Sequence, residues 1–344
     1  MLYLTCRVPG SAGGQRLDAF LRRQGLSAGL IRAVKHETGG FFADNMSIHT
    51  DMPVQPGQQL WFALPPEPAT TVRPQPVPFQ IRYEDDFVAV LNKPAGLAVH
   101  PTLNYPDATL ANGWLWHLTA EGKSGVFRPV NRIDKNTSGL VLCAGNAFAA
   151  PLLAKSACKC YIAIAEGNLP EAEGVIDAPI ARRGDSIIGR TVARDGKPSQ
   201  TRYQVLTRGG GYTLVACYPI TGRTHQIRVH FSYLGCPLAG DTLYGGHAGG
   251  ISRHALHCAA LRFCHPLDGA CRRMLSPLPA DMAALCRQCG IDPALPDLFA
   301  WLDALSPVPD RGRDFVPFTA LHQAPIATNI RRNYREIQRR DFDN

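Results

Sequence analysis

A dense run of prolines divides this chain. Six prolines lie within the fourteen residues 65–78, together with two threonines and one arginine. Each proline fixes its own φ angle and lacks a backbone donor, so the segment predicts an extended, semi-rigid linker without a packed core. We therefore expect a small N-terminal unit, residues 1–64, and a larger body that begins at residue 79.

The N-terminal unit changes its pattern half-way along. Apolar residues between Leu17 and Leu21 and between Leu26 and Val34 recur at helical spacing, which predicts two short helices. Short apolar pieces after Gly39-Gly40 predict a small sheet. The helical part carries four basic residues on polar positions: Arg22, Arg23, Arg32 and Lys35. Such a unit suits RNA binding, and a charged face that contacts only solvent is the alternative.

Composition narrows the class of protein. Apolar residues make up 45% of the 344 residues and charged residues 19%, which is typical of a globular chain with an ample core. The formal charge of +8 (36 basic minus 28 acidic residues) favours a polyanionic partner such as nucleic acid, although many basic proteins bind none. No apolar run approaches the ~18 residues of a membrane span, and the first ten residues lack a secretory-signal pattern. We expect no membrane partner.

The cysteines predict a cytoplasmic protein. Eleven of them, an odd number, are scattered over an enzyme-sized chain, which favours reduced thiols. Cys286 and Cys289 form a C-x-x-C pair, and Cys258, Cys264 and Cys271 precede it at spacings of six and seven residues. A structural zinc site needs four ligands, usually from two close pairs. These spacings supply only one such pair, so we expect no metal and interpret the cysteines as packing residues.

The body, residues 79–280, contains mostly strand patterns. Short apolar or β-branched runs at 87–91, 140–144 and 161–165 are bounded by Gly, Pro and Asn, and segments 201–206 and 212–217 alternate around a glycine-rich turn. Residues 224–234 have helical spacing. Few long helical patterns precede residue 280. The expected class is α+β, with a mixed, mainly antiparallel sheet in the body and a small α+β unit before it.

The last part, residues 281–344, differs in character. Segments 282–289 and 298–305 predict short helices. A basic cluster follows near the end: Arg331, Arg332, Arg335, Arg339 and Arg340. This extension either contacts phosphates or is an ordinary frayed terminus.

Two polar clusters carry the candidate chemistry. Asp134 follows Arg132 within segment 131–140, and segment 221–230 supplies Arg228. One carboxylate with basic neighbours suggests chemistry on a polyanionic substrate without a cofactor. Taken alone, an aspartate before Asn-Thr-Ser-Gly is more often the start of an Asx-type turn or a helix cap.

Read together, five ordered groups of residues resemble the RluA-type family of pseudouridine synthases, which isomerise uridine to pseudouridine in structured RNA. They are residues 85–100, 131–140, 159–163, 221–245 and 256–266. Segment 131–140 reads Asn-Arg-Ile-Asp-Lys-Asn-Thr-Ser-Gly-Leu, where the family has His-Arg-Leu-Asp-x-x-Thr-Ser-Gly-Leu or Val. The resemblance spans about residues 80–270. More weakly, residues 1–64 resemble the small RNA-binding domain of a ribosomal small-subunit protein.

The resemblance implies a role for each site residue. Asp134 acts on the ribose, Arg228 pairs with it, and Tyr161 stacks on the target base. Arg132 fills the gap that the extruded base leaves, and Leu256 packs against the other face of the pocket. Four further residues complete the candidate substrate-binding set: Asn131, Thr137, Arg223 and His225, of which His225 is also expected to act as hydrogen-bonded scaffold. The reaction needs no redox or metal chemistry, so no cofactor is expected.

The expected partner is RNA, first ribosomal large-subunit RNA and second transfer RNA, and the expected state is a monomer. The N-terminal unit favours the ribosome, because it is typical of the ribosome-directed members of the family. Asn131 and Ile133 depart from the family's His and Leu, which bears on the RNA target more than on the chemistry. Two alternatives are an inactive RNA-binding or ribosome-assembly factor and a nucleoside hydrolase that releases free uracil.

Overall fold

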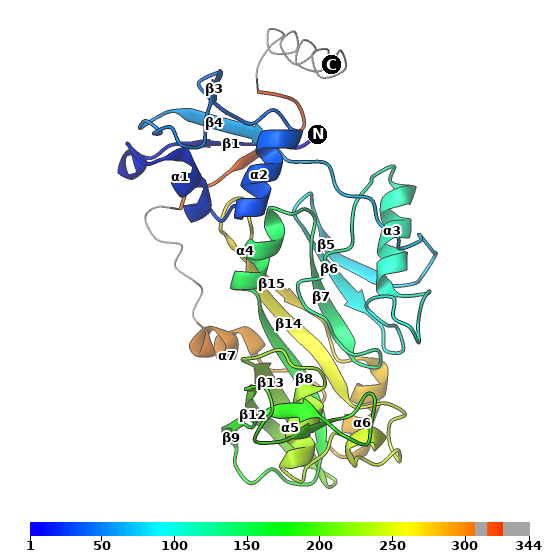
Figure 1. Cartoon of the computed structure of the whole chain (residues 1–344). Helices are drawn as coiled ribbons and strands as arrows, with labels where there is room; N and C mark the ends of the chain where they lie inside the picture. The colour runs from blue at the N-terminus through cyan, green and yellow to red at the C-terminus, as the bar shows by residue number, and fades with distance from the viewer. Residues whose placement is uncertain (307–314, 326–344) are drawn as a thin grey trace.

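The computed structural model describes residues 1–306 and 315–325. A small sheet forms most of the N-terminal unit, in the order β16-β1-β4-β2-β3. Its strands are β1 Tyr3–Arg7, β2 Phe41–Ala43, β3 Met46–Ile48, β4 Gln59–Ala63 and β16 Thr319–Leu321. Two helices, α1 Leu17–Arg23 and α2 Ala28–Glu37, lie on one side of this sheet (Figure 1). The predicted helices and the small sheet are therefore confirmed.

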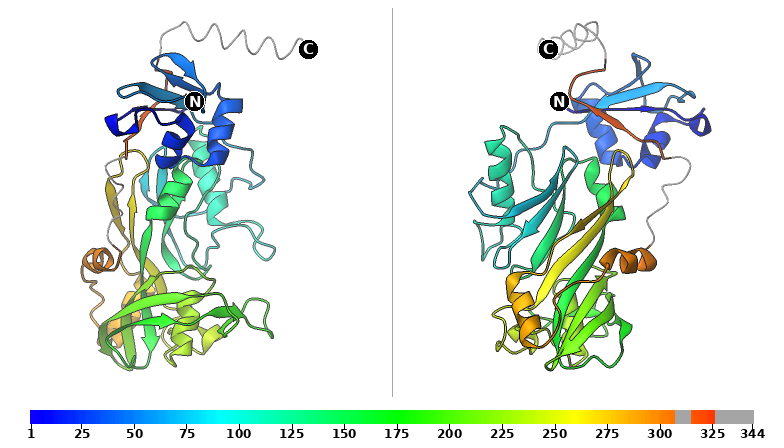
Figure 2. Two further views of the ribbon diagram at one scale, coloured as in Figure 1. Left: turned by 60° about the vertical axis from the view of Figure 1, so that its left-hand side comes forward. Right: turned by 180° about the vertical axis from the view of Figure 1, so that it is seen from behind.

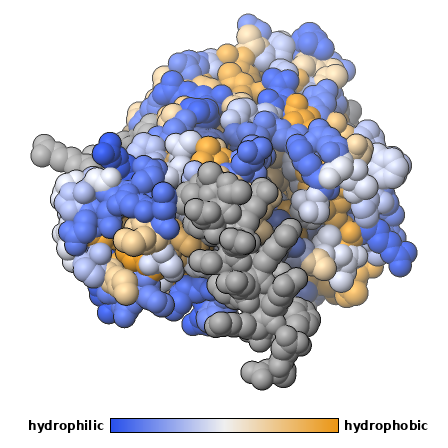
Figure 3. Space-filling model, turned by 90° about the horizontal axis from the view of Figure 1, so that it is seen from above, coloured by the Kyte–Doolittle hydropathy of each residue, from blue (hydrophilic) through white to orange (hydrophobic). Residues whose placement is uncertain are grey.

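These N-terminal elements are held together by one apolar core. The helical residues Leu17, Phe20 and Val34 are buried in the same cluster as Leu4 and Phe62 of the strands. Helix α2 begins at an N-cap, Ser27, whose side chain accepts a hydrogen bond from the backbone N–H of Leu30. From the N-terminal end of the molecule, the described surface is mainly hydrophilic, with hydrophobic residues only scattered over it (Figure 3).

The body is built on a nine-stranded sheet. The strand order is β5-β6-β7-β14-β8-β13-β12-β9, and β15 pairs with β14 beside this path. The bounds are β5 Gln80–Glu84, β6 Val88–Lys93, β7 Ser138–Ala144, β8 Cys158–Glu166, β9 Glu173–Asp177, β12 Gln200–Gly209, β13 Tyr212–Pro219, β14 Leu256–Cys264 and β15 Cys271–Leu275. The β7–β14 pair is parallel and the other pairs are antiparallel. The mixed, mainly antiparallel α+β class is confirmed.

The centre of the sheet explains the apolar runs in the sequence. Every residue of β7 and β14 is buried, and β8 is exposed only in part at two positions. Strands covered on both faces have near-continuous apolar sequences instead of alternating ones. A short hairpin, β10 Ile180–Arg182 and β11 Arg190–Val192, leaves the lower end of the sheet and packs against α5 Gln226–Tyr233 and a 3-10 turn, η2 Thr242–Tyr244 (Figures 1 and 2).

Two helices of the body were not predicted. Helix α3 Leu110–Ala120 begins at a capping box between Thr109 and Asn112, and seven of its eleven residues are buried. Because it is apolar nearly all round and contains Gly113, its sequence lacks the one-sided periodicity of a surface helix. The shorter α4 Ala149–Ser156 lies between the central strands and the N-terminal unit (Figure 1).

The C-terminal part returns to both sheets. Helices α6 Ala280–Gln288 and α7 Leu298–Leu305, both predicted, pack on the apolar cluster of β8, β13 and β14. Strand β16 then pairs antiparallel with β1, with Leu4 opposite Ala320, at the edge of the N-terminal sheet. No pattern in the residues predicted this pairing, which joins segments more than three hundred residues apart. The basic cluster from Arg331 to Arg340 lies outside the described residues.

The proline-rich segment contacts the body instead of running free. The main chain of this segment hydrogen-bonds to Asn112 in α3, through the carbonyl of Arg73 and the N–H of Gln75. Glu67 also forms an ion pair with Arg128. The segment contains no helix or strand, and these contacts hold it on the body. Within the described ranges, no helix is both long and apolar enough to cross a membrane.

Candidate active site

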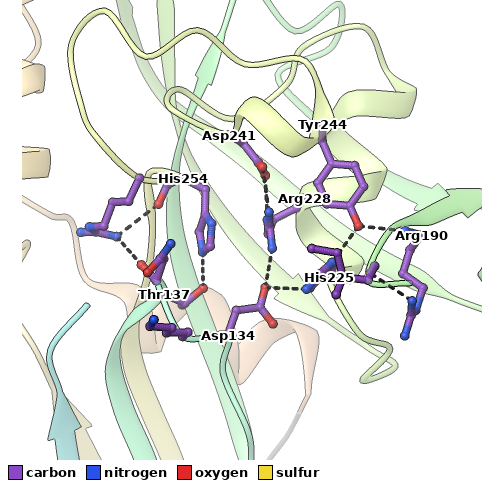
Figure 4. Close-up of polar contacts among 12 residues, drawn as sticks. Asp134, Thr137, Arg190, His225, Arg228, Asp241, Tyr244 and His254 are labelled. Atoms are coloured by element: carbon purple, nitrogen blue, oxygen red, sulfur yellow. Dashed lines mark hydrogen bonds and ion pairs between the residues drawn. The ribbon is translucent and has the colours of Figure 1, made fainter. Parts of the chain in front are cut away.

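The two polar clusters of the sequence meet at one pocket. Asp134 lies in the loop that leads into β7, and Arg228 lies in α5, ninety-four positions later. The guanidinium of Arg228 donates a hydrogen bond from Nη1 to Oδ2 of Asp134 at 3.1 Å (Figure 4). The predicted pairing of this carboxylate with this arginine is present in the structure.

Arg228 is fixed by a second carboxylate. Its Nε and Nη2 donate to the two carboxylate oxygens of Asp241 at 2.7 and 2.8 Å, a bidentate pair of the geometry that arginine favours. The Arg228 side chain is 8% exposed and that of Asp241 1%, whereas Asp134 is 26% exposed. Burial lowers the pKa of Arg228, but the hydrogen bonds and charges of Asp241 and Asp134 outweigh it and raise the pKa overall. The site therefore holds a permanent cation, Arg228. Asp241 is fixed against it by two hydrogen bonds, and Asp134 faces the pocket.

The pocket has a volume of about 740 Å³ and an aromatic and aliphatic wall. Tyr161 on β8 and Leu256 on β14 both line it, as does Asp134. Tyr161 pairs across the strands with Cys217 and Cys258, and it is buried. Burial raises the pKa of Tyr161 well above its usual value, so the phenol stays neutral. The predicted stacking residue and its aliphatic neighbour thus lie in the same cavity as the carboxylate.

Asn131 and Thr137 line the pocket, but their polar side-chain atoms form hydrogen bonds with other groups of the protein. The amide of Asn131 donates to the carbonyl of Leu140 and accepts from the N–H of Leu142. The Thr137 hydroxyl hydrogen-bonds to Nε2 of His254 at 2.8 Å (Figure 4). These contacts fix the loop that carries Asp134 at both of its ends. For these two residues, contact with a substrate stays a prediction.

Arg132, Arg223 and His225 surround the opening of the same pocket. Both arginines are exposed, and Arg223 donates from Nε to the carbonyl of Pro198. His225 precedes α5 and directs Nε2 towards Asp134 Oδ2, 3.9 Å away. The structure thus places all nine predicted site residues around one cavity.

Comparison with known proteins identifies the family. The family model described as RNA pseudouridylate synthase matches residues 87–233, which include Asp134, Tyr161 and Arg228. An uncharacterized RNA pseudouridine synthase of Bacillus subtilis, YjbO, is 39% identical over 267 residues, which cover 76% of this chain and 94% of that protein. The chain belongs to the RNA pseudouridine synthase family, of the RluA type. It is an isomerase.

Two further comparisons agree with this assignment. The ribosomal large subunit pseudouridine synthase D of Xanthomonas campestris is 35% identical to this synthase over 303 residues, 81% of this chain and 90% of the relative. Among solved structures, the human RNA pseudouridylate synthase domain containing 1 superposes with a TM-score of 0.54 at 27% identity, covering 71% of this chain and all of that one.

Four polar residues of the synthase's site were missed from the sequence: Lys93, Asp241, Tyr244 and His254. Asp241 and Tyr244 stand in the Gly-Asp-x-x-Tyr-Gly segment that carried part of the family resemblance, so a signal was present. Lys93 is buried and donates from Nζ to three carbonyls, those of Pro94, Leu97 and Lys135. Burial lowers the pKa of Lys93 to about 7, although the negative charge of Asp134 acts to raise it. Lys93 therefore ties the Asp134 loop to the end of β6.

One group of side chains in the described part of the synthase has the spacing of a metal site: Glu84, His117 and Glu121. Lys123 lies against it, with Nζ 2.6 Å from Glu121. These residues do not line the pocket of Asp134. A lysine already supplies the positive charge there, so the group is explained as an ion-pair cluster between β5 and α3.

Proposed function

We propose that this synthase isomerises uridines of ribosomal large-subunit RNA and uses Asp134 as its catalytic carboxylate. A single observation carries the proposed chemistry: Asp134 is a partly exposed carboxylate that lines the pocket, and it faces a guanidinium that Asp241 holds in place. The carboxylate can attack the ribose carbon of the glycosidic bond and displace uracil, or take a proton from the ribose as that bond breaks. When the turned uracil bonds to the same ribose carbon through one of its ring carbons, Asp134 is displaced or returns the proton, and the ring carbon loses its hydrogen.

The shape of the pocket supports extrusion of the target base. A uridine stacked inside a helix cannot bring its ribose to Asp134, and unstacking it costs a few kcal/mol. Stacking on an aromatic ring recovers about 1–3 kcal/mol per base. We propose that Tyr161 and Leu256 hold the extruded uracil while Arg132, exposed at the rim, occupies the space that the base leaves in the RNA.

The basic side chains of the N-terminal unit support RNA as the substrate. The two helices of this unit carry four basic side chains, Arg22, Arg23, Arg32 and Lys35, and all four are exposed. Exposed cations of this kind bind phosphates with little regard to sequence. The large-subunit synthase of Xanthomonas campestris, similar over 81% of this chain, is the reason for preferring ribosomal RNA to transfer RNA. We further propose that the synthase acts as a cytoplasmic monomer, which agrees with its eleven free cysteines.

Replacing the carboxylate by its amide tests the mechanism. Asp134→Asn keeps the size and hydrogen-bonding capacity of the side chain but removes its charge. We expect this variant to bind RNA with unchanged affinity and to form no pseudouridine, as measured by tritium release from uridine-labelled RNA. Turnover by Asp134→Asn would refute the mechanism, and free uracil among the products would indicate a hydrolase.

A matched control is Asp195→Asn, since Asp195 is an exposed carboxylate on the turn after β11. This variant should have the turnover of the original enzyme. The choice of RNA is tested by supplying 23S-type ribosomal RNA fragments and transfer RNA in parallel and by mapping pseudouridines in a deletion strain. Modification of transfer RNA alone would overturn the ribosomal assignment and leave the chemistry intact.

A further inference from the structure

His225 occupies an unusual position in this site. It lies just before α5 with φ = 58°, a left-handed conformation that residues other than glycine seldom adopt. Its side chain is 15% exposed. Nε2 lies 3.9 Å from Oδ2 of Asp134, and Nδ1 lies 2.7 Å from the hydroxyl of Tyr244 (Figure 4). The imidazole therefore stands between the reacting carboxylate and a phenol.

The hydroxyl of Tyr244 determines which imidazole nitrogen carries hydrogen. This hydroxyl accepts a hydrogen bond from the backbone N–H of Arg190 at 3.0 Å. Burial raises the pKa of Tyr244, so the phenol keeps its own hydrogen. In the described structure the partner at hand for that hydrogen is Nδ1 of His225. If Nδ1 accepts, a neutral imidazole carries its hydrogen on Nε2, the nitrogen that faces Asp134.

Tyr244 also supports the other group that faces Asp134. The guanidinium of Arg228 lies over the Tyr244 ring, 4.9 Å from its centroid. The rings of Tyr244 and His225 meet edge-on, with centroids 5.7 Å apart. One side chain on η2 thus positions both nitrogen donors of the pocket. Its hydroxyl is held in turn by the first residue of β11.

The surroundings of His225 favour a neutral ring. Burial lowers the pKa of His225, and the charges of Arg228 and Arg190 lower it further. The charges of Asp134 and Asp241 act in the opposite direction without cancelling these effects. A neutral ring adds an N–H donor beside Asp134 without adding a second positive charge that would compete for the carboxylate.

We propose that Tyr244 and the main chain of Arg190 hold His225 as the Nε2–H tautomer, and that His225 is a positioning residue for Asp134. This rests on the proposed catalytic role of Asp134. Arg228 already donates to Oδ2 of that carboxylate, and Nε2 of His225 faces the same oxygen. In enzymes without substrate, such contacts are often long and tighten when substrate binds. With both donors on Oδ2, the other oxygen, Oδ1, is left for the ribose.

The tautomer can be observed directly in the full-length enzyme. Nitrogen-15 NMR of the histidine side chains distinguishes a protonated Nε2 from a protonated Nδ1. We expect His225 to be neutral with hydrogen on Nε2 at pH about 7. Tyr244→Phe keeps the ring under Arg228 and removes only the hydroxyl. In that variant we expect a mixture of tautomers and a His225 pKa closer to its ordinary value.

Kinetics then test the positioning role. We expect kcat to fall about tenfold in Tyr244→Phe and at least as much in His225→Ala, the rate equivalent of one hydrogen bond to a charged group. KM should stay within about twofold, because the contact acts on the reacting carboxylate and not on RNA binding. His225→Gln restores a donor near the place of Nε2 and should recover part of the loss. In Tyr244→Phe, the decline of kcat on acidification should begin at a higher pH.

The control is Tyr233→Phe, because Tyr233 is 61% exposed at the end of α5 and does not line the pocket. It should match the original enzyme in every measurement. A Tyr244→Phe variant with unchanged kcat, pH profile and tautomer would overturn the inference, as would hydrogen on Nδ1 in the original enzyme. If Asp134→Asn still turns over, the proposed function itself fails; if only His225 and Tyr244 prove dispensable, this inference alone fails.

Discussion

The arginine of the pocket and the arginines of the N-terminal helices illustrate two uses of one side chain. Arg228 is buried between Asp241 and Asp134, with each nitrogen contact defined. Arg22, Arg23 and Arg32 are exposed on α1 and α2. A buried cation must be paired to offset its lost hydration, and the pairing fixes its position. An exposed cation attracts a polyanion over roughly the Debye length of about 8 Å without fixed geometry.

The largest effect is expected where the buried pair is broken. Asp241→Asn removes the charge that locks Arg228 and leaves a buried guanidinium with one carboxylate. We expect the free energy of unfolding to fall by about 3 kcal/mol or more, together with a marked loss of kcat. Chemical denaturation and the tritium-release assay measure the two quantities.

The matched variant for this comparison is Asp281→Asn. Asp281 binds Arg253 in the same bidentate manner, but its side chain is 43% exposed. Solvent screening should limit its loss of stability to about 1 kcal/mol. Equal losses in the two variants would show that burial of the carboxylate is not what strengthens the ion pair of the pocket.

Buried histidines should make the body sensitive to acid. Burial is the largest cause that lowers the pKa of His254 to about 3 and that of His257 to about 4, from 6.5. Between these values and 6.5 the unfolded chain binds more protons than the folded one. The free energy of unfolding is therefore complete above pH 6.5 and decreases below it, by up to about 5 kcal/mol for His254 and about 3 kcal/mol for His257.

Denaturation of the His254→Gln variant across this pH range measures how much His254 alone contributes to the acid sensitivity. The stability of this variant should depend less steeply on pH than that of the original enzyme. His36→Gln, at an exposed position in α2, should leave the dependence unchanged. Identical pH dependence in all three proteins would exclude His254 as a source of the acid sensitivity.

The exposed arginines should affect binding and not chemistry. With Arg22 and Arg23 both changed to glutamine, we expect RNA affinity to fall about tenfold and the salt dependence of binding to become shallower by about one unit per lost phosphate contact. kcat should not change. The adjacent pair Arg272 and Arg273 on β15, changed in the same way, controls for net charge. An equal loss in both variants would assign no special role to the N-terminal unit.

The smallest effect concerns the cap of α2. Ser27→Ala removes the hydroxyl that accepts from Leu30 N–H, which should cost about 1 kcal/mol of stability. Because Ser27 lies in the N-terminal unit, kcat at saturating RNA should be unaffected. A variant as stable as the original would mean that the helix is held by its apolar face alone.

Several elements could be predicted because their signal is local. The apolar runs of β7 and β8, the hairpin of β12 and β13, and the helices α1, α2, α6 and α7 each occupy a few consecutive residues of clear pattern. Helix α3 was missed because it is buried on most sides. Strand β16 was missed because three residues carry no pattern until β1 lies beside them.

The residues of the candidate site also fall into two groups, those that could be named before the structure was known and those whose contacts only the structure shows. Asp134, Tyr161 and Arg228 could be named because each stands in a segment that resembles the family. Asp241 was quoted only as part of a motif, because nothing in its neighbourhood indicates that it binds Arg228. Asn131 and Thr137 were expected to meet substrate, whereas in the structure their polar atoms hold the Asp134 loop.

The order of residues alone determined the proline-rich division of the chain, the apolar strands at the centre of the body and the family to which this synthase belongs. Tertiary structure decided which charges meet. Asp134, His225, Arg228 and Tyr244 become neighbours only after β7, α5 and η2 pack together around the central strands. Burial then excludes water from Arg228 and Asp241, and in that setting a pair of charges acquires fixed geometry.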